Sequence, residues 1–110
     1  VEHDPIILAT PVYWYTMSAP MKTFIDRWSD LLDIRKDLGR RLANKELYVI
    51  AAYGGELPGG FEDAFSNTCN YLKMKYKGCF YYYTRNDPKK IEKNTLAIEQ
   101  FNAKICPTAF

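Results

Sequence analysis

The sequence has little cysteine and histidine, the residues on which disulfide frameworks and many metal sites depend. Its three cysteines, Cys69, Cys79 and Cys106, include no CxxC pair, and its single histidine is His3. An odd, unclustered set of cysteines argues against a disulfide scaffold, a cysteine metal site and an iron–sulfur cluster, and indicates reduced thiols in a cytoplasmic protein. One histidine near the terminus argues against a histidine-based catalytic triad or metal site inside the domain.

Long apolar runs and a strong charge imbalance are also missing. No apolar run is long enough to span a bilayer, and no basic stretch followed by an apolar one marks a secretory signal. The 15 Lys and Arg against 13 Asp and Glu leave a net charge of +2, which is too small for an electrostatic binder of nucleic acid. What remains, 110 residues with 47% hydrophobic and 15% aromatic content, is typical of one globular domain.

Three stretches have the composition of β-strands. Residues 6–10 and 46–53 are almost continuously apolar, which is typical of strands covered on both faces within a parallel sheet. Residues 79–84 are more polar and predict a strand nearer the edge of that sheet.

The first helix is expected after the first strand. Ser18 is a good N-cap, and Pro20 suits the first helical turn because no amide donor is needed there. One helical stripe of apolar residues follows, made of Met21, Phe24, Ile25, Trp28, Leu31 and Leu32. A polar connection over residues 35–41 leads to the second strand.

Two more helices are predicted between and after the remaining strands. Residues 61–77 form the second, which ends at Gly78 and has apolar positions at Phe61, Phe65, Cys69, Leu72 and Tyr76. Asp87 caps the third, with Pro88 in its first turn and an inner stripe of Ile91, Ile98, Phe101 and Ile105. The order β-α-β-α-β-α predicts an α/β fold with a parallel sheet and right-handed crossovers.

Two loops follow strand ends, where open α/β sheets bind their ligands. The first, residues 10–18, is rich in aromatics, and the second, residues 53–60, combines Tyr53 with four glycines. Aromatic faces and closely approaching backbone amides suit a planar, hydrogen-bonding heterocycle. The alternative is that Tyr13, Trp14 and Tyr53 only pack the end of the sheet, and the residues alone leave both interpretations open.

The first loop and the helix after it, TPVYWYTMSAPMKTFIDR over residues 10–27, closely resemble the flavin loop and helix of NAD(P)H-dependent FMN reductases. Tyr53-Gly54-Gly55-Glu56, followed by Gly59-Gly60, is similar to the second isoalloxazine loop of that family. Residues 42–45, LANK, fit the family's entry into the next strand. The resemblance implies a flavodoxin-like, doubly wound sheet of order 2-1-3-4-5, with FMN at the switch point between the first and third strands.

The same resemblance implies the chemistry and the site. Hydride passes from NAD(P)H to the flavin and on to a small-molecule acceptor such as a quinone, azo or nitro compound, so no catalytic side chain is expected. Backbone amides around Tyr13 and Trp14 are expected to hold the pyrimidine edge of the ring. The resemblance also implies a homodimer. The expected cofactor-binding residues are Thr10, Pro11, Val12, Tyr13, Trp14, Thr16, Met17, Tyr53, Gly54, Gly55 and Glu56.

The chain departs from the family pattern at its start. The family's N-terminal strands and phosphate-binding loop are missing, so residues 1–110 are interpreted as the C-terminal portion of a single flavodoxin-like domain, with residues 6–10 as an exposed sheet edge. Two alternatives stay open. One is a flavodoxin-type electron carrier, although its usual acidic docking surface disagrees with a pI near 8.4. The other is an inactive flavodoxin-like interaction fragment.

Overall fold

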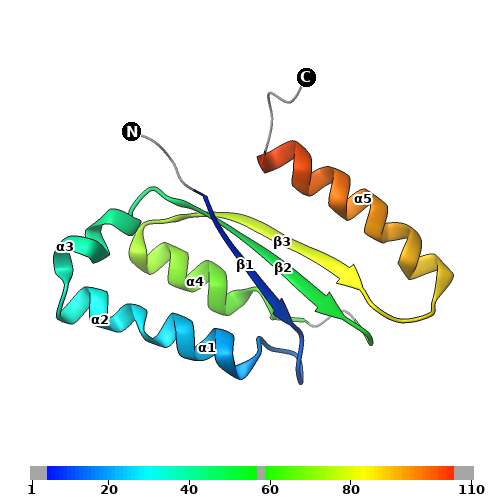
Figure 1. Cartoon of the computed structure of the whole chain (residues 1–110), viewed down its shortest axis with the longest axis horizontal. Helices are drawn as coiled ribbons and strands as arrows, with labels where there is room; N and C mark the ends of the chain where they lie inside the picture. The colour runs from blue at the N-terminus through cyan, green and yellow to red at the C-terminus, as the bar shows by residue number, and fades with distance from the viewer. Residues whose placement is uncertain (1–4, 57–58, 106–110) are drawn as a thin grey trace.

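The structure is a computed structural model that describes residues 5–56 and 59–105, without the side chains of Leu31, Leu32 and Leu38. The predictions for His3 and Cys106 lie outside these residues. Strands and helices alternate as predicted (Figure 1), in the order β1 (Ile6–Pro11), α1 (Ala19–Asp26), α2 (Trp28–Asp33), α3 (Lys36–Gly39), a 3₁₀ turn (Arg40–Leu42), β2 (Glu46–Tyr53), α4 (Asp63–Leu72), β3 (Lys75–Tyr83) and α5 (Pro88–Ile105).

The three strands form one parallel sheet in the order β1-β2-β3, so β2 is central and β3 lies at an edge, as predicted. Successive strand residues point to opposite faces. On one face, Leu47, Val49 and Ala51 pack with side chains of α1, α2 and α4 and are almost fully buried. On the other face, Tyr48 meets Phe101 of α5 edge to face at 5.8 Å. The sheet therefore has helices on both faces, which confirms the predicted α/β architecture.

The face toward α5 is covered only in part. Ile7 of β1, which was expected to be covered on both faces, is 45% exposed, and Tyr82 and Ile98 are also exposed. Whereas a compact domain of this length has a radius of gyration of about 13 Å, this chain has 15.2 Å and measures only 18 Å across its shortest axis. The expected coverage of β1 is thus wrong for one face, because α5 lies over β3 and β2 only.

The helix after β1 starts as predicted and then breaks. The Ser18 hydroxyl accepts a hydrogen bond from the Met21 amide at 3.3 Å, which confirms the N-cap. The break falls at Arg27, where the Asp30 amide bonds the Arg27 carbonyl three residues back and tightens the chain into a new turn. Phe24 is consequently half exposed while Trp28 is buried. Residues 35–41, expected as a plain connection, contain α3 and most of the 3₁₀ turn.

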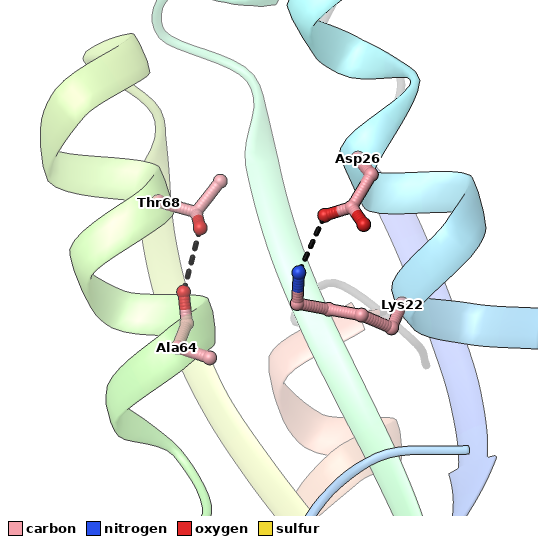
Figure 2. A network of polar contacts seen from close by, with 4 residues as sticks. All are labelled: Lys22, Asp26, Ala64 and Thr68. Carbon is pink, nitrogen blue, oxygen red and sulfur yellow. Dashed lines mark hydrogen bonds and ion pairs between the residues drawn. The ribbon is translucent and has the colours of Figure 1, made fainter. Parts of the chain in front are cut away.

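α1 and α4 each have an exposed polar contact between residues one helical turn apart (Figure 2). Lys22 and Asp26 form an exposed ion pair one helical turn apart, and the Thr68 hydroxyl donates to the Ala64 carbonyl at 2.6 Å. Such exposed pairs stabilise a helix by only about 0.2–0.5 kcal/mol. The burial of Phe65, Cys69 and Leu72 on the inner face of α4 is the larger contribution.

The predicted boundary between α4 and β3 is wrong. The helix ends at Leu72, because Lys73 adopts a left-handed conformation with φ of 61° and the Met74 amide returns to the Cys69 carbonyl at 2.8 Å. Residues 75–77 are strand, so Tyr76 belongs to the sheet and not to a helical stripe. Gly78 ends no helix: its φ of 113° lies within β3, beside a shift in the β2–β3 register.

The last helix begins at the predicted cap, where the Asp87 carboxylate accepts from the Lys89 amide at 3.1 Å. Its inner face differs from the expected one. Ile91 and Ile98 are 44% and 49% exposed, whereas Phe101 packs on the sheet. The buried residue is the polar Asn94, whose side-chain amide bonds both the N–H and the C=O of Tyr83. The helix is therefore fastened to the end of β3 through hydrogen bonds as well as apolar contacts.

Candidate functional site

Both loops singled out in the sequence leave the same end of the sheet. β1 and β2 are parallel neighbours whose carboxyl ends lie side by side (Figure 1). Their pairing continues past β1, because the Val12 amide donates to the Ala52 carbonyl at 2.9 Å. The two loops therefore start next to each other at the edge where ligands of open α/β sheets bind.

The first loop contains a tight hairpin over residues 13–16. The Tyr13 amide donates to the Thr16 carbonyl at 2.9 Å, and the Thr16 amide donates back to the Tyr13 carbonyl at 3.1 Å. Between them, Trp14 and Tyr15 have φ of 49° and 68°. Such turns normally carry Asn-Gly, since a left-handed conformation costs other residues about 1–2 kcal/mol each. Two adjacent aromatic residues held there are local strain of the kind that clusters at functional sites.

This hairpin presents free hydrogen-bond donors and aromatic faces. The amides of Trp14 and Tyr15 have no acceptor among the described residues, whereas that of Tyr13 is used by Thr16. The side chains of Tyr13, Trp14 and Tyr15 are 59%, 91% and 66% exposed. The alternative that these aromatics pack the end of the sheet is therefore wrong for Tyr13 and Trp14. It holds for Tyr53, which is 7% exposed.

The base of the first loop is fixed from beneath. Thr10 is 3% exposed, and its hydroxyl accepts from the Ser18 amide at 2.9 Å and donates to the Pro11 carbonyl at 2.8 Å. Met17 is buried in the core, while Pro11 and Val12 are half-buried. Thr10 and Met17 thus shape the loop, whereas Tyr13, Trp14 and Thr16 are its exposed part.

The second loop is held at its start by β3 and the segment after it. The Tyr53 carbonyl accepts from both the amide and the hydroxyl of Thr84, at 2.9 and 3.0 Å. Arg85 lies against Gly54 so closely that a Cβ there would come within 2.6 Å of its Nε. A Cβ on Gly55 would meet nothing within 4 Å, so the backbone at this point is open to a ligand.

Two cationic side chains at this loop, Lys90 and Arg85, were not predicted from the sequence. Lys90 of α5 donates to the Gly55 carbonyl at 3.2 Å and lies 3.9 Å from the Glu56 carboxylate, which is itself exposed. Arg85, which touches Gly54, precedes the same helix. The order of the elements could have indicated them, because Arg85 and Lys90 follow β3, and the carboxyl end of β3 lies at the same edge of the sheet as those of β1 and β2.

A polar cluster lies behind the second loop. The Glu62 carboxylate accepts from the Tyr76 hydroxyl at 2.6 Å and from the Tyr81 hydroxyl at 3.0 Å. Burial, together with these bonds to Glu62, raises the pKa of both phenols well above its ordinary value, so they remain donors at every physiological pH. The Tyr81 ring also touches Tyr53 and Phe61, which lie at the two ends of the loop. The cluster therefore supports the loop.

The cysteines near this cluster are expected to be inert. Burial raises the pKa of the Cys79 thiol to about 12, with the nearby Glu62 charge adding to it, and burial raises that of Cys69 to about 11. A free cysteine has a pKa of about 8.5 and is partly thiolate at pH 8, whereas both of these thiols stay neutral there. In a Cys106→Ser chain at pH 8, we expect the folded protein to react with a disulfide reagent at least about 100-fold more slowly than free cysteine. Unfolding in urea should expose both thiols and let them react quickly. Fast reaction of either thiol in the folded chain would contradict its burial.

Relief of strain in the hairpin gives a second expected result. Tyr15→Gly removes the left-handed penalty at a mostly exposed position, and even after the entropy that glycine costs it should raise the free energy of unfolding by about 0.5–1 kcal/mol. The matched control is Thr16→Gly, next in the same turn but without a positive φ, which should lower it. Urea denaturation measures both. Equal destabilisation by the two variants would show that Tyr15 is not strained.

A groove of about 750 Å³ runs along β3 and α5. It is lined by residues such as Phe80, Leu96 and Ala97 and reaches Tyr53 at the end of β2. The described part of the chain contains no cluster of three metal-ligating side chains. Across the same ranges, no helix is both long and apolar enough to cross a membrane. The carboxyl edge of the sheet therefore remains the place where free donors, exposed rings and open backbone meet.

Comparisons with known proteins identify the fold family of the chain. A family model described as "Flavodoxin-like fold" matches residues 1–105. The chain is 39% identical to a protein of Bacillus subtilis (strain 168) that carries the name NAD(P)H-dependent FMN-containing oxidoreductase YwqN. The aligned stretch of 79 residues covers 66% of this chain and 43% of that protein. The chain is 30% identical over 84 residues to the uncharacterised NAD(P)H oxidoreductase YcaK of Escherichia coli (strain K12), which covers 68% and 42%.

A solved structure supports the same assignment. The Trp repressor binding protein from Bacillus subtilis superposes with a TM-score of 0.70 and 32% identity, over 88% of this chain and 61% of that one. The chain spans less than half the length of the two curated relatives. Its three parallel strands, its helices and its sequence together place it in the flavodoxin-like fold family.

Proposed function

We propose that this chain forms the flavin-ring site of an FMN-dependent NAD(P)H oxidoreductase. The observation that carries the proposal is the strained hairpin, whose Trp14 and Tyr15 amides are free among the described residues at the ligand-binding edge of the sheet. The names of YwqN and YcaK agree with it. The residues present fit a flavin, because its polar edge carries acceptor atoms and its faces are flat and aromatic.

Each part of the site has a distinct task in this proposal. The amides of Trp14 and Tyr15 donate to acceptors on the ring's polar edge, and the exposed aromatic side chains lie against its faces. Gly55 lets the second loop approach without a side chain in the way, and Gly54 leaves room for the Arg85 side chain behind it. Pro11, Val12, Thr16 and Glu56 flank these contacts, while Thr10, Met17 and Tyr53 keep the loops in shape. When bound, FMN supplies the hydride transfer from NAD(P)H to an acceptor such as a quinone, azo or nitro compound.

The test separates an oxidoreductase from an electron carrier. The FMN-loaded protein is mixed anaerobically with NADPH or NADH, and the flavin absorbance near 450 nm is followed. The proposal predicts bleaching by the nicotinamide cofactor alone, then recovery when a quinone is added. A bound flavin that dithionite bleaches but neither nicotinamide cofactor does would make the protein a carrier. Failure to bind FMN would leave an interaction fragment, and either outcome overturns the proposal.

The expected homodimer and cytoplasmic location belong to the same proposal. The open strand β1 and the exposed residues Ile7, Tyr82 and Ile98 give the chain apolar surface that a second polypeptide can cover. Analytical ultracentrifugation at increasing protein concentration tests the dimer. A sedimentation coefficient that stays at the monomer value up to millimolar protein would exclude it.

A further inference from the structure

Lys90 reaches from α5 to the second loop and is held there by three contacts. Its ammonium donates to the Gly55 carbonyl at 3.2 Å, lies 3.9 Å from the Glu56 carboxylate and sits 5.4 Å from the centre of the Tyr83 ring. The residues it joins are 35 positions apart in the sequence. Fixing a lysine side chain costs rotamer freedom, and three contacts to one ammonium together offset that cost.

The base of Lys90 is equally well anchored. Its own amide donates to the carbonyl of the capping residue Asp87 at 3.0 Å. One turn further along α5, the side chain of Asn94 bonds both backbone groups of Tyr83, at 2.8 and 2.9 Å. Residues four apart lie on the same face of a helix. One face of α5 therefore binds the end of β3 through Asn94 and the second loop through Lys90.

The position of Lys90 decides which way one peptide group faces. The C=O of Gly55 and the N–H of Glu56 belong to the same planar trans peptide and point in opposite directions. Because the carbonyl is held toward Lys90, the Glu56 amide points away from α5. That amide has no acceptor among the described residues. Next to it, Gly55 leaves the approach open.

We propose that Lys90 is a positioning residue: its bond to the Gly55 carbonyl turns the Glu56 amide outward as a third donor for the acceptor edge of a planar ligand. This deepens the proposed function and rests on it, since the ligand in question is the flavin ring. The competing explanation is that Lys90 only adds positive charge that attracts an anionic ligand. The two differ for riboflavin, which has the ring of FMN but no phosphate.

Three variants separate these explanations. Lys90→Met keeps the length of the side chain and loses the donor, whereas Lys90→Arg keeps a donor. Lys89→Met removes the same charge from the same helical turn, and the Lys89 side chain has no contact with the described residues of the loop. We expect Lys90→Met to weaken riboflavin binding about tenfold or more, because a charge-assisted bond that fixes the peptide is lost. Lys90→Arg should bind within about threefold and Lys89→Met within about twofold of the unmodified chain.

A second readout needs no ligand. In the free protein, ¹⁵N relaxation should give rigid order parameters of about 0.8 for the Gly55 and Glu56 amides, falling below about 0.6 in Lys90→Met and unchanged in Lys89→Met. Equal riboflavin affinity, or equal order parameters, in the two methionine variants would overturn the positioning role. If the unmodified chain binds no flavin, the proposed function fails, and the relaxation comparison still decides whether Lys90 orders the loop.

Discussion

Replacement of Asn94 by leucine should lower the free energy of unfolding by about 2–5 kcal/mol, because two backbone groups lose their partner in a buried place. Asn94 is 8% exposed and bonds the N–H and the C=O of Tyr83 at 2.8 and 2.9 Å. Leucine is similar in size but can satisfy neither group. The Tyr83 amide and carbonyl would remain buried without bonds.

Asn102→Leu is the matched control, since Asn102 is an exposed residue of the same helix with no described side-chain contact. Urea denaturation of both variants and the parent chain gives the comparison. The Asn94 variant should unfold at clearly lower urea concentration, while the Asn102 variant should stay within about 0.5 kcal/mol of the parent chain. Similar midpoints for the two variants would mean that the Asn94 bonds do not anchor α5.

Truncation of Phe65 to alanine should cost about 3–5 kcal/mol, the usual range for a fully buried aromatic residue. Phe65 is a residue of α4, is 0% exposed, and its ring centre lies 5.6 Å from that of Phe61. The ring belongs to a cluster of buried side chains that includes Phe61, Cys69 and Leu72, so its removal leaves a cavity in the core. Thermal or urea unfolding measures the loss.

Phe24→Ala provides the contrast on the first helix. Phe24 is 51% exposed, and its ring meets that of Trp28 edge to face at 5.8 Å. Its loss should cost about 1 kcal/mol. A cost for Phe65→Ala no larger than that for Phe24→Ala would show that the core does not lie between the sheet and α4.

Features fixed by local chemistry could be predicted from the sequence. The bounds of β2 follow from its continuous apolar run, and the caps Ser18 and Asp87 follow from side chains that bond amides a few residues away. The boundary of α4 could not be predicted in this way. Residues 73–77 suit a lysine-rich helix end by pattern, but the sheet gains a longer third strand if the helix stops at Leu72. Tertiary pairing therefore overrode the local helical preference.

In the candidate site, too, the locally encoded features could be predicted and the long-range contacts could not. The two loops and their aromatics could be located because they follow apolar strands and resemble a known motif. The left-handed Trp14 and Tyr15 could not be foreseen, because bulky residues rarely adopt that conformation. Lys90, Asn94 and Glu62 act across 35, 11 and 14 or more residues of sequence. No periodicity or spacing encodes such long-range contacts.

We expect the carboxyl edge of the sheet to bind a flavin ring through the free amides of its two loops. A ¹H–¹⁵N titration of the chain with riboflavin and with FMN tests this binding directly. Saturable shifts of the Trp14, Tyr15 and Glu56 amides are expected with both compounds. Shifts that cluster instead along the groove between β3 and α5, or no saturable shift with either compound, would contradict it.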